Sequence, residues 1–338
     1  MSGTGKRVTL QMIAEQAGVS VVTVSNVLSG KKKASEEMQN RIQKIADALG
    51  YQKGAGNRIG SEKFCVLIAE RYVSEPNSYY MGMYRQIVQA ASRREAVVAL
   101  EIVDLDRELQ HTPMGILPGY TMDGILIVGE MRPEFIDRIQ EEYPIPVVCV
   151  DFYDVDRSMD FVITDSYRGM YKAVERLIAC GHERIAYVGT IGATSSIMDR
   201  YLGYRKAMLM HGLTSLDPIP DRAEDGTGYR AVLTLPKERP TAYVCNCERT
   251  ARLLIRQLEE SGTHVPADVS VAAFDRMQNT SPKDIRLTVY ESDEAAMAEI
   301  GVSVLWARVH KKNRPQRIHT VQGRVVDGDS VRRRETVG

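Results

Sequence analysis

The chain shows two patterns of hydrophobic residues, one in its N-terminal segment and another in the rest of the sequence. In the N-terminal segment, apolar side chains recur at the helical spacing i, i+3, i+4 and i+7. Within its first helix these positions are Leu10, Ile13, Ala14 and Ala17. From residue 64 onward, short and nearly continuous apolar runs alternate with amphipathic stretches. That pattern is typical of buried parallel strands separated by helices, so we expect a small helical segment followed by an α/β body.

The N-terminal segment predicts three short helices. Thr9 can cap the first, and Gly18 supplies a turn before Ser20, which can cap a second helix over 21–28. A third helix is expected over 35–50, ending at a glycine. Three short helices, the second of which follows a Gly-containing turn, form a helix-turn-helix with a supporting helix.

The charge of the chain is balanced overall but unevenly distributed. The full sequence carries 44 Lys and Arg against 44 Asp and Glu. Residues 1–63 hold ten basic and five acidic side chains, so this part carries +5 and the remaining 275 residues carry −5. A small basic module attached to an acidic body favours an anionic partner such as nucleic acid for the module.

The stretch VTLQMIAEQAGVSVVTVSNVLSG, followed by RIQKIADALGYQ, closely resembles the headpiece of LacI-type bacterial transcription regulators. The likeness continues through nearly all of the chain. It implies a homodimeric regulator, a repressor, whose second helix enters the major groove of a near-palindromic double-stranded operator. The residues expected to contact DNA are Thr9, Ser20, Val21, Val22, Thr23, Ser25, Asn26, Lys31, Arg58 and Ile59.

The second helix indicates what kind of DNA sequence could be read. Asn26 can form a bidentate pair with adenine, whereas Val21 and Val22 can sense only shape and thymine methyl groups. The hydroxyls of Thr23 and Ser25 suit phosphate contacts, which position a protein on DNA without specifying a sequence. We therefore expect a half-site rich in A·T pairs.

Residues 51–63 form the expected hinge linker. In the resembling family this stretch forms a short helix on operator DNA and inserts a Leu into the minor groove. Here Arg58 fits the family pattern and Ile59 is the candidate wedge, one residue before the Leu position. Three glycines within 54–60 each cost helix stability by about 1 kcal/mol relative to Ala, so a helix here is weakly favoured.

The body is expected to contain two doubly wound parallel-sheet subdomains, the layout of periplasmic binding proteins. The expected strands are 64–70, 97–103, 124–129, 146–151, 184–189, 242–245 and 269–274. The expected helices lie near 79–94, 133–142, 166–180, 199–211, 248–261 and 293–309. The domains are then a headpiece (1–50), the linker (51–63) and an effector-binding body (64–338). In that body the N-subdomain comprises about 64–163 and 292–316, and the C-subdomain about 164–291 and 317–338.

Ligands of open α/β sheets bind beyond the carboxyl ends of the strands, which face a cleft in a two-lobed protein. The expected effector-binding residues are Tyr79, Tyr80, Ser196, Arg200, Arg222, Asn246, Glu248 and Asp275. Asp275 and Arg200 match effector-binding positions of the resembling family, and a guanidinium suits adjacent sugar hydroxyls or a carboxylate. A salt bridge to Asp199 is the structural alternative for Arg200.

The remaining cleft positions leave alternatives open. Tyr79 and Tyr80 could stack on a sugar face or belong to the core. The family's Asn-Asp pair can be aligned in two ways here, which is why Asn246 and Glu248 are both included. Arg222, with its neighbour Asp221, stands where some relatives present an aromatic residue, which favours a polar or anionic sugar over a purine. Secondary candidates at other strand ends are Asp151, Phe152 and Asp165.

Several classes of protein are excluded or disfavoured. No apolar run approaches a membrane span, and the five cysteines, an odd number, suit a reducing compartment, so we expect a cytoplasmic protein. There is no Gly-rich phosphate loop, nucleophile motif or metal-ligand cluster, so we expect no enzyme activity, cofactor or metal. The expected effector is a small polar molecule, a sugar or sugar derivative. The alternative is a regulator of the same architecture whose degenerate cleft is controlled by a protein partner.

Overall fold

The computed structural model describes residues 9–29, 35–49, 62–73, 79–110, 121–222, 228–276, 284–310 and 315–334. The chain divides into two compact units, Met1–Ser61 and Glu62–Gly338. Of the residues expected to contact DNA, Lys31, Arg58 and Ile59 lie outside the described residues, as does the expected hinge helix. None of the described helices is both long and apolar enough to span a membrane.

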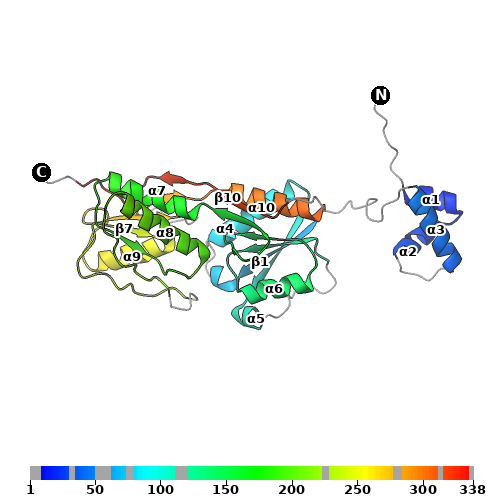
Figure 1. Cartoon of the computed structure of the whole chain (residues 1–338), viewed down its shortest axis with the longest axis horizontal. Coiled ribbons are helices and arrows are strands. Elements are labelled where there is room, and N and C mark those ends of the chain that lie inside the picture. Colours follow the sequence, from blue (N-terminus) through cyan, green and yellow to red (C-terminus); the bar gives the residue numbers. More distant parts are fainter. Residues whose placement is uncertain are drawn as a thin grey trace, which may run out of the picture. The chain divides into compact units, whose positions relative to one another are not determined.

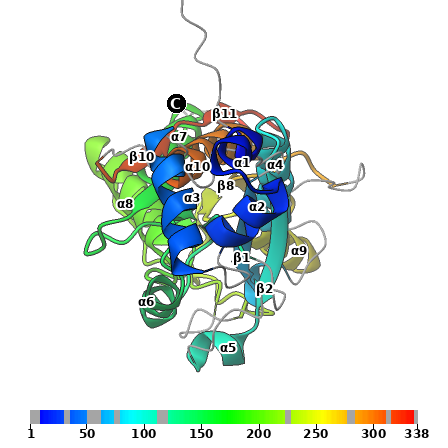
Figure 2. The same cartoon turned by 90° about the vertical axis from the view of Figure 1, so that its right-hand side faces the viewer.

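The N-terminal unit is a three-helix head, seen as the blue helices in Figure 2. Its helices are α1 (Leu10–Ala17), α2 (Val21–Ser29) and α3 (Glu36–Ala48). Thr9 caps α1, Gly18 takes the left-handed conformation at φ 67°, and the Ser20 hydroxyl accepts a hydrogen bond from the Thr23 amide. Ile13, Val24 and Ile42 pack in a common core, so the three predicted helices are confirmed.

The first lobe of the body is built on a six-stranded parallel sheet with the order β10-β5-β4-β3-β1-β2. The strands are β1 (Lys63–Ala69), β2 (Val97–Val103), β3 (Gly124–Val128), β4 (Val147–Val150), β5 (Asp160–Thr164) and β10 (Ile318–Val321). The helices are α4 (Tyr79–Ser92), α5 (Leu105–Leu109), α6 (Pro133–Glu142) and α10 (Glu294–Val309), with a 3-10 turn at Glu70–Tyr72.

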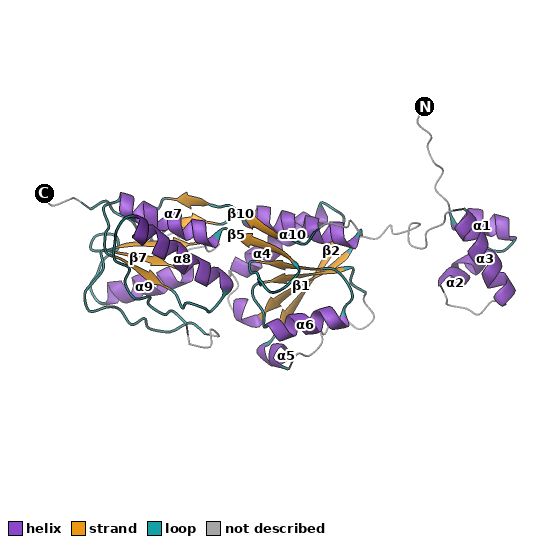
Figure 3. Ribbon diagram, in the orientation of Figure 1, coloured by secondary structure: helices purple, strands orange, loops and turns teal. Residues whose placement is uncertain are grey.

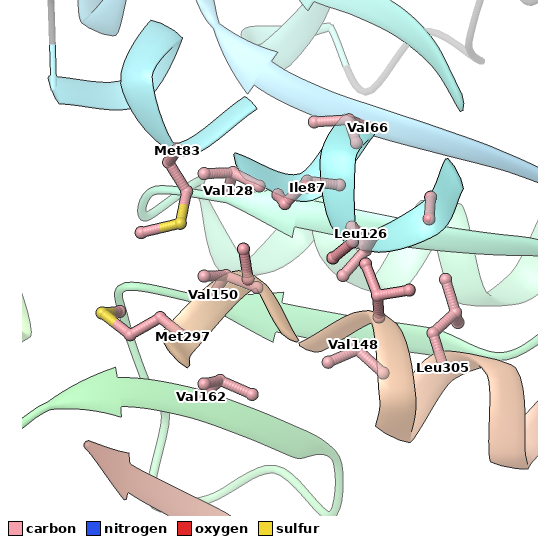
Figure 4. Packing of buried hydrophobic residues seen from close by; sticks show 14 of the residues in the cluster. Val66, Met83, Ile87, Leu126, Val128, Val148, Val150, Val162, Met297 and Leu305 are labelled. Carbon is pink, nitrogen blue, oxygen red and sulfur yellow. The ribbon is translucent and has the colours of Figure 1, made fainter. Parts of the chain in front are cut away.

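Both faces of this sheet are covered by helices, as the layers in Figure 1 and Figure 3 show. On one face, α4 and α10 pack against the strands; Figure 4 shows Met83 and Ile87 with Met297 and Leu305 around Leu126. On the other face α6 contributes its own apolar side chains. Burial on both faces explains why these strands read as continuous apolar runs in the sequence.

The second lobe has a five-stranded sheet with the order β11-β9-β8-β7-β6, in which only the β11–β9 pairing is antiparallel. The strands are β6 (Ile185–Val188), β7 (Ala242–Cys245), β8 (Ser270–Phe274), β9 (Thr288–Glu291) and β11 (Arg324–Val326). The helices are α7 (Ser166–Ala179), α8 (Ser195–Met210) and α9 (Glu248–Glu260). In this lobe α7 and α8 cover one face and α9 the other.

One boundary expected from the sequence is wrong. The third crossing between lobes was placed at 316–317, which assigned 317–338 to the second lobe. In the structure Ile318–Val321 pairs in parallel with Phe161–Thr164, so β10 is an edge strand of the first lobe. The chain crosses only after Val321, and β11 then joins the second sheet. A second difference is local: α8 begins at Ser195, four residues before the expected start, because Thr194 caps it.

Candidate functional site

Each lobe places an aspartate directly after the carboxyl end of a central strand. Asp151 follows β4 and Asp275 follows β8, and both are mostly buried. Both adopt left-handed backbone conformations, with φ of 70° and 56°, which Asp tolerates better than most residues. This tight turn after the strand holds each carboxylate at the carboxyl edge of its sheet, where open α/β sheets bind ligands.

In the second lobe, Asp275 is held beside a buried arginine. The Nη2 of Arg200 lies 3.4 Å from Oδ2 of Asp275, and its Nη1 donates a 2.8 Å hydrogen bond to the backbone carbonyl of Asn246. The guanidinium also stacks over the ring of Phe274 at 3.9 Å, and its Nε has no partner among the described residues. The amide of Ser292 donates to the other oxygen of Asp275. Burial raises the pKa of Asp275, and Arg200 and Ser292 act in the opposite direction.

This arrangement decides between the two sequence interpretations of Arg200. Its salt bridge is to Asp275 after β8 and not to its neighbour Asp199. The Asp199 carboxylate instead accepts a hydrogen bond from the Tyr153 hydroxyl at 3.2 Å. Sequence adjacency was misleading because successive residues of a helix project in different directions.

In the first lobe, Asp151 meets aromatic hydroxyls. The Tyr79 and Tyr80 hydroxyls lie 3.4 Å and 3.1 Å from its two carboxylate oxygens. Burial raises the pKa of Asp151 to about 7, with Asp275 acting in the same direction and Arg200 and the two hydroxyls opposing. Arg200 and Asp275 of the second lobe therefore act electrostatically on a carboxylate of the first lobe.

A third tyrosine completes this aromatic group and was missed by the sequence reasoning. The Tyr72 ring stacks on Tyr80 with centroids 4.4 Å apart, and its hydroxyl donates to the backbone carbonyl of Glu130 at 3.0 Å. Gly129 makes room for both rings, since a Cβ there would lie 2.8 Å from Tyr80 and 2.9 Å from Tyr72. A signal was available in the tyrosine just after the first strand and the glycine that follows β3.

Hydrogen bonds join the lobes across the cleft. The Glu130 carboxylate, from the first lobe, accepts hydrogen bonds from both the amide (2.7 Å) and the hydroxyl (2.9 Å) of Ser195 at the start of α8. A carboxylate is stabilised there by the partial positive charge of the helix N-terminus. The bond from Tyr153 to Asp199 also links the first lobe to α8.

The remaining expected effector residues have different surroundings. Asn246 is fully buried, and its amide nitrogen donates to Asp221 at 2.6 Å, while its Oδ1 has no partner within the described ranges. Glu248 forms an ion pair with Arg252 along α9 at 2.7 Å. The Ser196 hydroxyl lies 3.1 Å from that of Thr194. The structure thus gathers Arg200, Asn246 and Asp275 in one group and Tyr79 with Tyr80 in another, whereas Glu248 is paired elsewhere.

Cavities remain around these contacts. A very small one, about 10 Å³, lies beside Asp151 and Ser196. A polar cavity of about 200 Å³ is lined by Arg71, Tyr72, Leu105, Glu130, Met131, Arg132, Pro133, Ala193, Thr194 and Arg222. A more apolar cavity of about 360 Å³ is lined by Glu130, Met131, Pro133, Ile136, Phe152, Tyr153, Asp154, Val155, Ser195, Met198 and Asp199. The described residues include no group of His, Cys, Asp and Glu side chains that could hold a metal ion.

In the head, the expected DNA-contacting residues lie on and around α2. Val21 and Val22 are exposed, the latter to 68%, as is Ser25, while Thr23 and Asn26 are half-buried. The hydroxyls of Thr9 and Ser20 are engaged in helix capping.

Comparisons with known proteins agree with this architecture. Residues 9–53 match the family model of bacterial regulatory proteins of the lacI family, and residues 174–331 match a periplasmic binding protein-like domain. The HTH-type transcriptional repressor PurR of Pectobacterium atrosepticum is 24% identical over 329 residues, covering 96% of each chain. The PurR repressor of Vibrio campbellii is also 24% identical, covering 96% of this chain and 99% of its own.

Solved structures show the same fold. The Lac repressor dimer bound to operator and the anti-inducer ONPF superposes with a TM-score of 0.67 at 20% identity, covering 97% of this chain and all of that one. A complex of the transcriptional regulator CelR with cellobiose gives 0.66 at 21% identity, covering 96% and 100%. The relatives are transcriptional repressors and not enzymes. The chain therefore joins a helix-turn-helix domain of the lacI family, over residues 9–53, to a periplasmic-binding-protein-like domain, over residues 174–331.

Proposed function

We propose that this DNA-binding transcription repressor acts as a cytoplasmic homodimer on a near-palindromic operator, and that a small polar ligand between its lobes controls operator affinity. The observation that carries the ligand proposal is the buried Arg200–Asp275 pair, which lies near the Asp151–tyrosine group of the opposite lobe. Together these residues offer both donors and acceptors to a hydroxyl-rich molecule: a guanidinium, two carboxylates and phenolic hydroxyls.

A carbohydrate is the ligand class that we propose. Tyrosine rings next to hydrogen-bonding groups suit a sugar, whose faces are apolar and whose edges carry hydroxyls. Two structures of the same fold support this choice, since the CelR structure holds cellobiose and a regulator from Enterococcus faecium holds ribose. Arg222 in place of a stacking aromatic fits a polar ligand better than a flat apolar base.

Control of DNA binding would follow from a difference in ligand affinity between two arrangements of the lobes. A ligand that bonds to both lobes favours the arrangement in which they are closest, and the linker over 51–61 passes the change to the paired heads. Coupling of this kind is typically worth about 1–3 kcal/mol, roughly a five- to 150-fold change in operator affinity.

Asn26→Ala tests the DNA-reading assignment. Operator fragments are first selected by the purified chain from a randomised double-stranded library, and affinity is then measured by fluorescence anisotropy. Loss of a bidentate adenine contact should weaken binding by about 1–3 kcal/mol, roughly 5- to 150-fold. The matched control is Asn40→Ala, because Asn40 is an exposed asparagine on α3. Unchanged affinity in Asn26→Ala would show that α2 is not the reading helix, and failure to enrich any duplex would contradict DNA binding itself.

A second candidate is control by a protein partner through a degenerate cleft. The space beside Asp151 is only about 10 Å³, and the rings of Tyr72 and Tyr80 pack against each other next to it. A thermal-shift screen against sugars separates the two, because a ligand that binds the folded state raises apparent stability by mass action. No stabilisation by any small molecule, together with intact operator binding, would favour the protein partner.

A further inference from the structure

The polar cavity of about 200 Å³ draws its wall from both lobes. Glu130 and Arg132 come from the loop between β3 and α6 in the first lobe, whereas Thr194 and Arg222 come from the second. A water molecule takes about 30 Å³ of liquid volume, so the cavity has room for a group the size of a phosphate or carboxylate. Its opening is therefore a place where one ligand group could contact both lobes.

Of the three arginines that line the cavity, Arg71 already has its charge balanced. It forms an ion pair with the fully buried Glu108 and donates a 2.7 Å hydrogen bond to the backbone carbonyl of Glu130. A buried carboxylate without its cation would be costly, so this arginine is needed where it is. Arg71 thus shapes the wall of the cavity.

The other two arginines retain donors for a ligand. The guanidinium of Arg132 is exposed and makes no ion pair or side-chain hydrogen bond with the described part of the chain. Arg222 donates one hydrogen bond to the Tyr229 hydroxyl at 2.9 Å, while its buried Nε has no hydrogen-bond partner within the described ranges. This Nε makes only a long ion pair of 3.9 Å with Oδ1 of Asp221, whose carboxylate accepts hydrogen bonds from the Thr190 amide and the Asn246 side chain.

The position of Arg222 is fixed by aromatic packing. Its guanidinium lies 4.5 Å from the centroid of the Tyr229 ring, which Arg249 approaches to 4.0 Å. A guanidinium held in place by stacking and one hydrogen bond loses little freedom when it binds an anion. An arginine whose guanidinium is held by aromatic packing and one hydrogen bond at the wall of a polar cavity is accordingly a preorganised anion donor.

The negative charge of the Glu130 carboxylate limits where an anionic group of a ligand could lie in this cavity. It occupies the N-terminus of α8 by accepting both donors of Ser195, so that position is taken by the chain itself. A ligand anion would avoid this like charge and lie toward Arg132 and Arg222.

We propose that Arg132 and Arg222 bind a phosphate or carboxylate group of the small ligand across the two lobes, so that the effector is an anionic sugar derivative. This inference rests on the proposed ligand control and narrows its ligand class. Because the two arginines come from opposite lobes, an anion between them favours the closed arrangement. A neutral sugar lacks this bridging group, so its affinity differs less between the two arrangements of the lobes and it shifts their equilibrium less.

The test uses the full chain and ligands that differ only in charge. Thermal shift and calorimetry compare inorganic phosphate, D-glucose 6-phosphate, D-gluconate and D-glucose, each at the same ionic strength set with sodium chloride. We expect stabilisation by inorganic phosphate or by gluconate beyond the chloride level, and tighter binding of the charged sugar than of D-glucose. A response confined to phosphate compounds or to gluconate identifies which anion is preferred.

Variants connect this binding to the two arginines. Arg132→Ala and Arg222→Gln should each weaken anion binding by about tenfold or more, the loss expected for a hydrogen bond to a charged group. The matched control is Arg138→Ala, an arginine on α6 that pairs with Glu142 outside the cavity, which should bind as the unmodified chain does. Arg132 is exposed, so its variant should fold even if replacement of Arg222 disturbs the second lobe.

Two results would overturn the proposal. One is the absence of any anion-specific stabilisation, and the other is unchanged anion affinity in both arginine variants. Operator affinity measured on the same samples keeps this separate from the proposed function. Anions that bind without changing operator affinity would contradict ligand control but leave the anion site standing, whereas intact operator binding without any anion response would contradict the anion site alone.

Discussion

The two lobes place an aspartate at the same structural position and give it opposite surroundings. Asp151 and Asp275 both follow a central parallel strand, both have positive φ, and both are mostly buried. Asp275 faces the guanidinium of Arg200 and the amide of Ser292. Asp151 faces the hydroxyls of Tyr79 and Tyr80. The backbone therefore sets where each carboxylate lies, and its neighbours set its charge.

The difference gives the two sides of the cleft different chemical characters. A cation and a fixed amide donor favour the ionised form of Asp275 and oppose the effect of burial. For Asp151, Arg200 of the opposite lobe and the two phenolic hydroxyls compensate only in part, so burial raises its pKa to about 7. The second lobe thus offers a carboxylate paired with a cation, and the first offers aromatic surface with an acid whose charge changes near neutral pH.

Removal of the cation in the second lobe should have the largest effect. Arg200→Ala leaves Asp275 buried without its counter-charge and removes the stacking on Phe274. We expect a loss of about 3–5 kcal/mol in the free energy of unfolding, measured by urea denaturation followed by circular dichroism. The control is Arg205→Ala, an exposed arginine on the same helix, which should cost under about 1 kcal/mol. A small loss for Arg200→Ala would mean that Asp275 is not dependent on its cation.

Asp151→Asn tests the titratable carboxylate of the first lobe. Its pKa is about 7 in the folded chain against an ordinary 3.8, so between these values the folded state holds a proton that the unfolded state releases. The contribution of this group to stability therefore falls as pH rises from about 4 to about 7, by up to about 4 kcal/mol. Asn does not titrate, so the variant should gain stability relative to the unmodified chain between pH 5 and pH 8.

The matched control for this pH dependence is Asp137→Asn. Arg157 lowers the pKa of the exposed Asp137 carboxyl, so the stability that it contributes is present above its ordinary pKa and lost only below it. Its replacement should leave the slope between pH 5 and pH 8 unchanged. If Asp151→Asn also leaves that slope unchanged, the carboxylate of Asp151 is ionised throughout this range.

The sequence predicted most of the buried strands because burial on both faces leaves a continuous apolar signal. It missed β5 and β9, which are short strands inside their sheets, and also β10 and β11, which lie at sheet edges and carry exposed side chains such as Ile318. Pairing of β10 with β5 joins residues more than 150 positions apart, and nothing in the local pattern of either segment indicates it. The misplaced third crossing follows from the failure to recognise β10.

The contacts within the candidate effector site were likewise not predictable from the local sequence. Arg200 and Asp275 were recognisable one at a time, because each matches an effector-binding position of the resembling family and Asp275 also follows a strand. That they pair with each other depends on the packing of α8 against β8, which a sequence does not display. Glu130 was missed because its partner, Ser195, belongs to the opposite lobe.

The smallest effect on stability is expected when a single hydroxyl that contacts Asp151 is removed from the first lobe. Tyr80→Phe keeps the ring that stacks on Tyr72 but removes a hydroxyl 3.1 Å from the Asp151 carboxylate. We expect a loss of about 1 kcal/mol at pH 8, where the acceptor is ionised, and a smaller loss at pH 5, because hydrogen bonds to charged groups are stronger. The pKa of Asp151 should rise further, since this hydroxyl lowers it. Tyr79→Phe, which removes the longer 3.4 Å contact, is the control and should cost less at both pH values. A greater loss at pH 5 than at pH 8 would show that the hydroxyl stabilises the protonated acid, and the contrast drawn between the two aspartates would then be wrong.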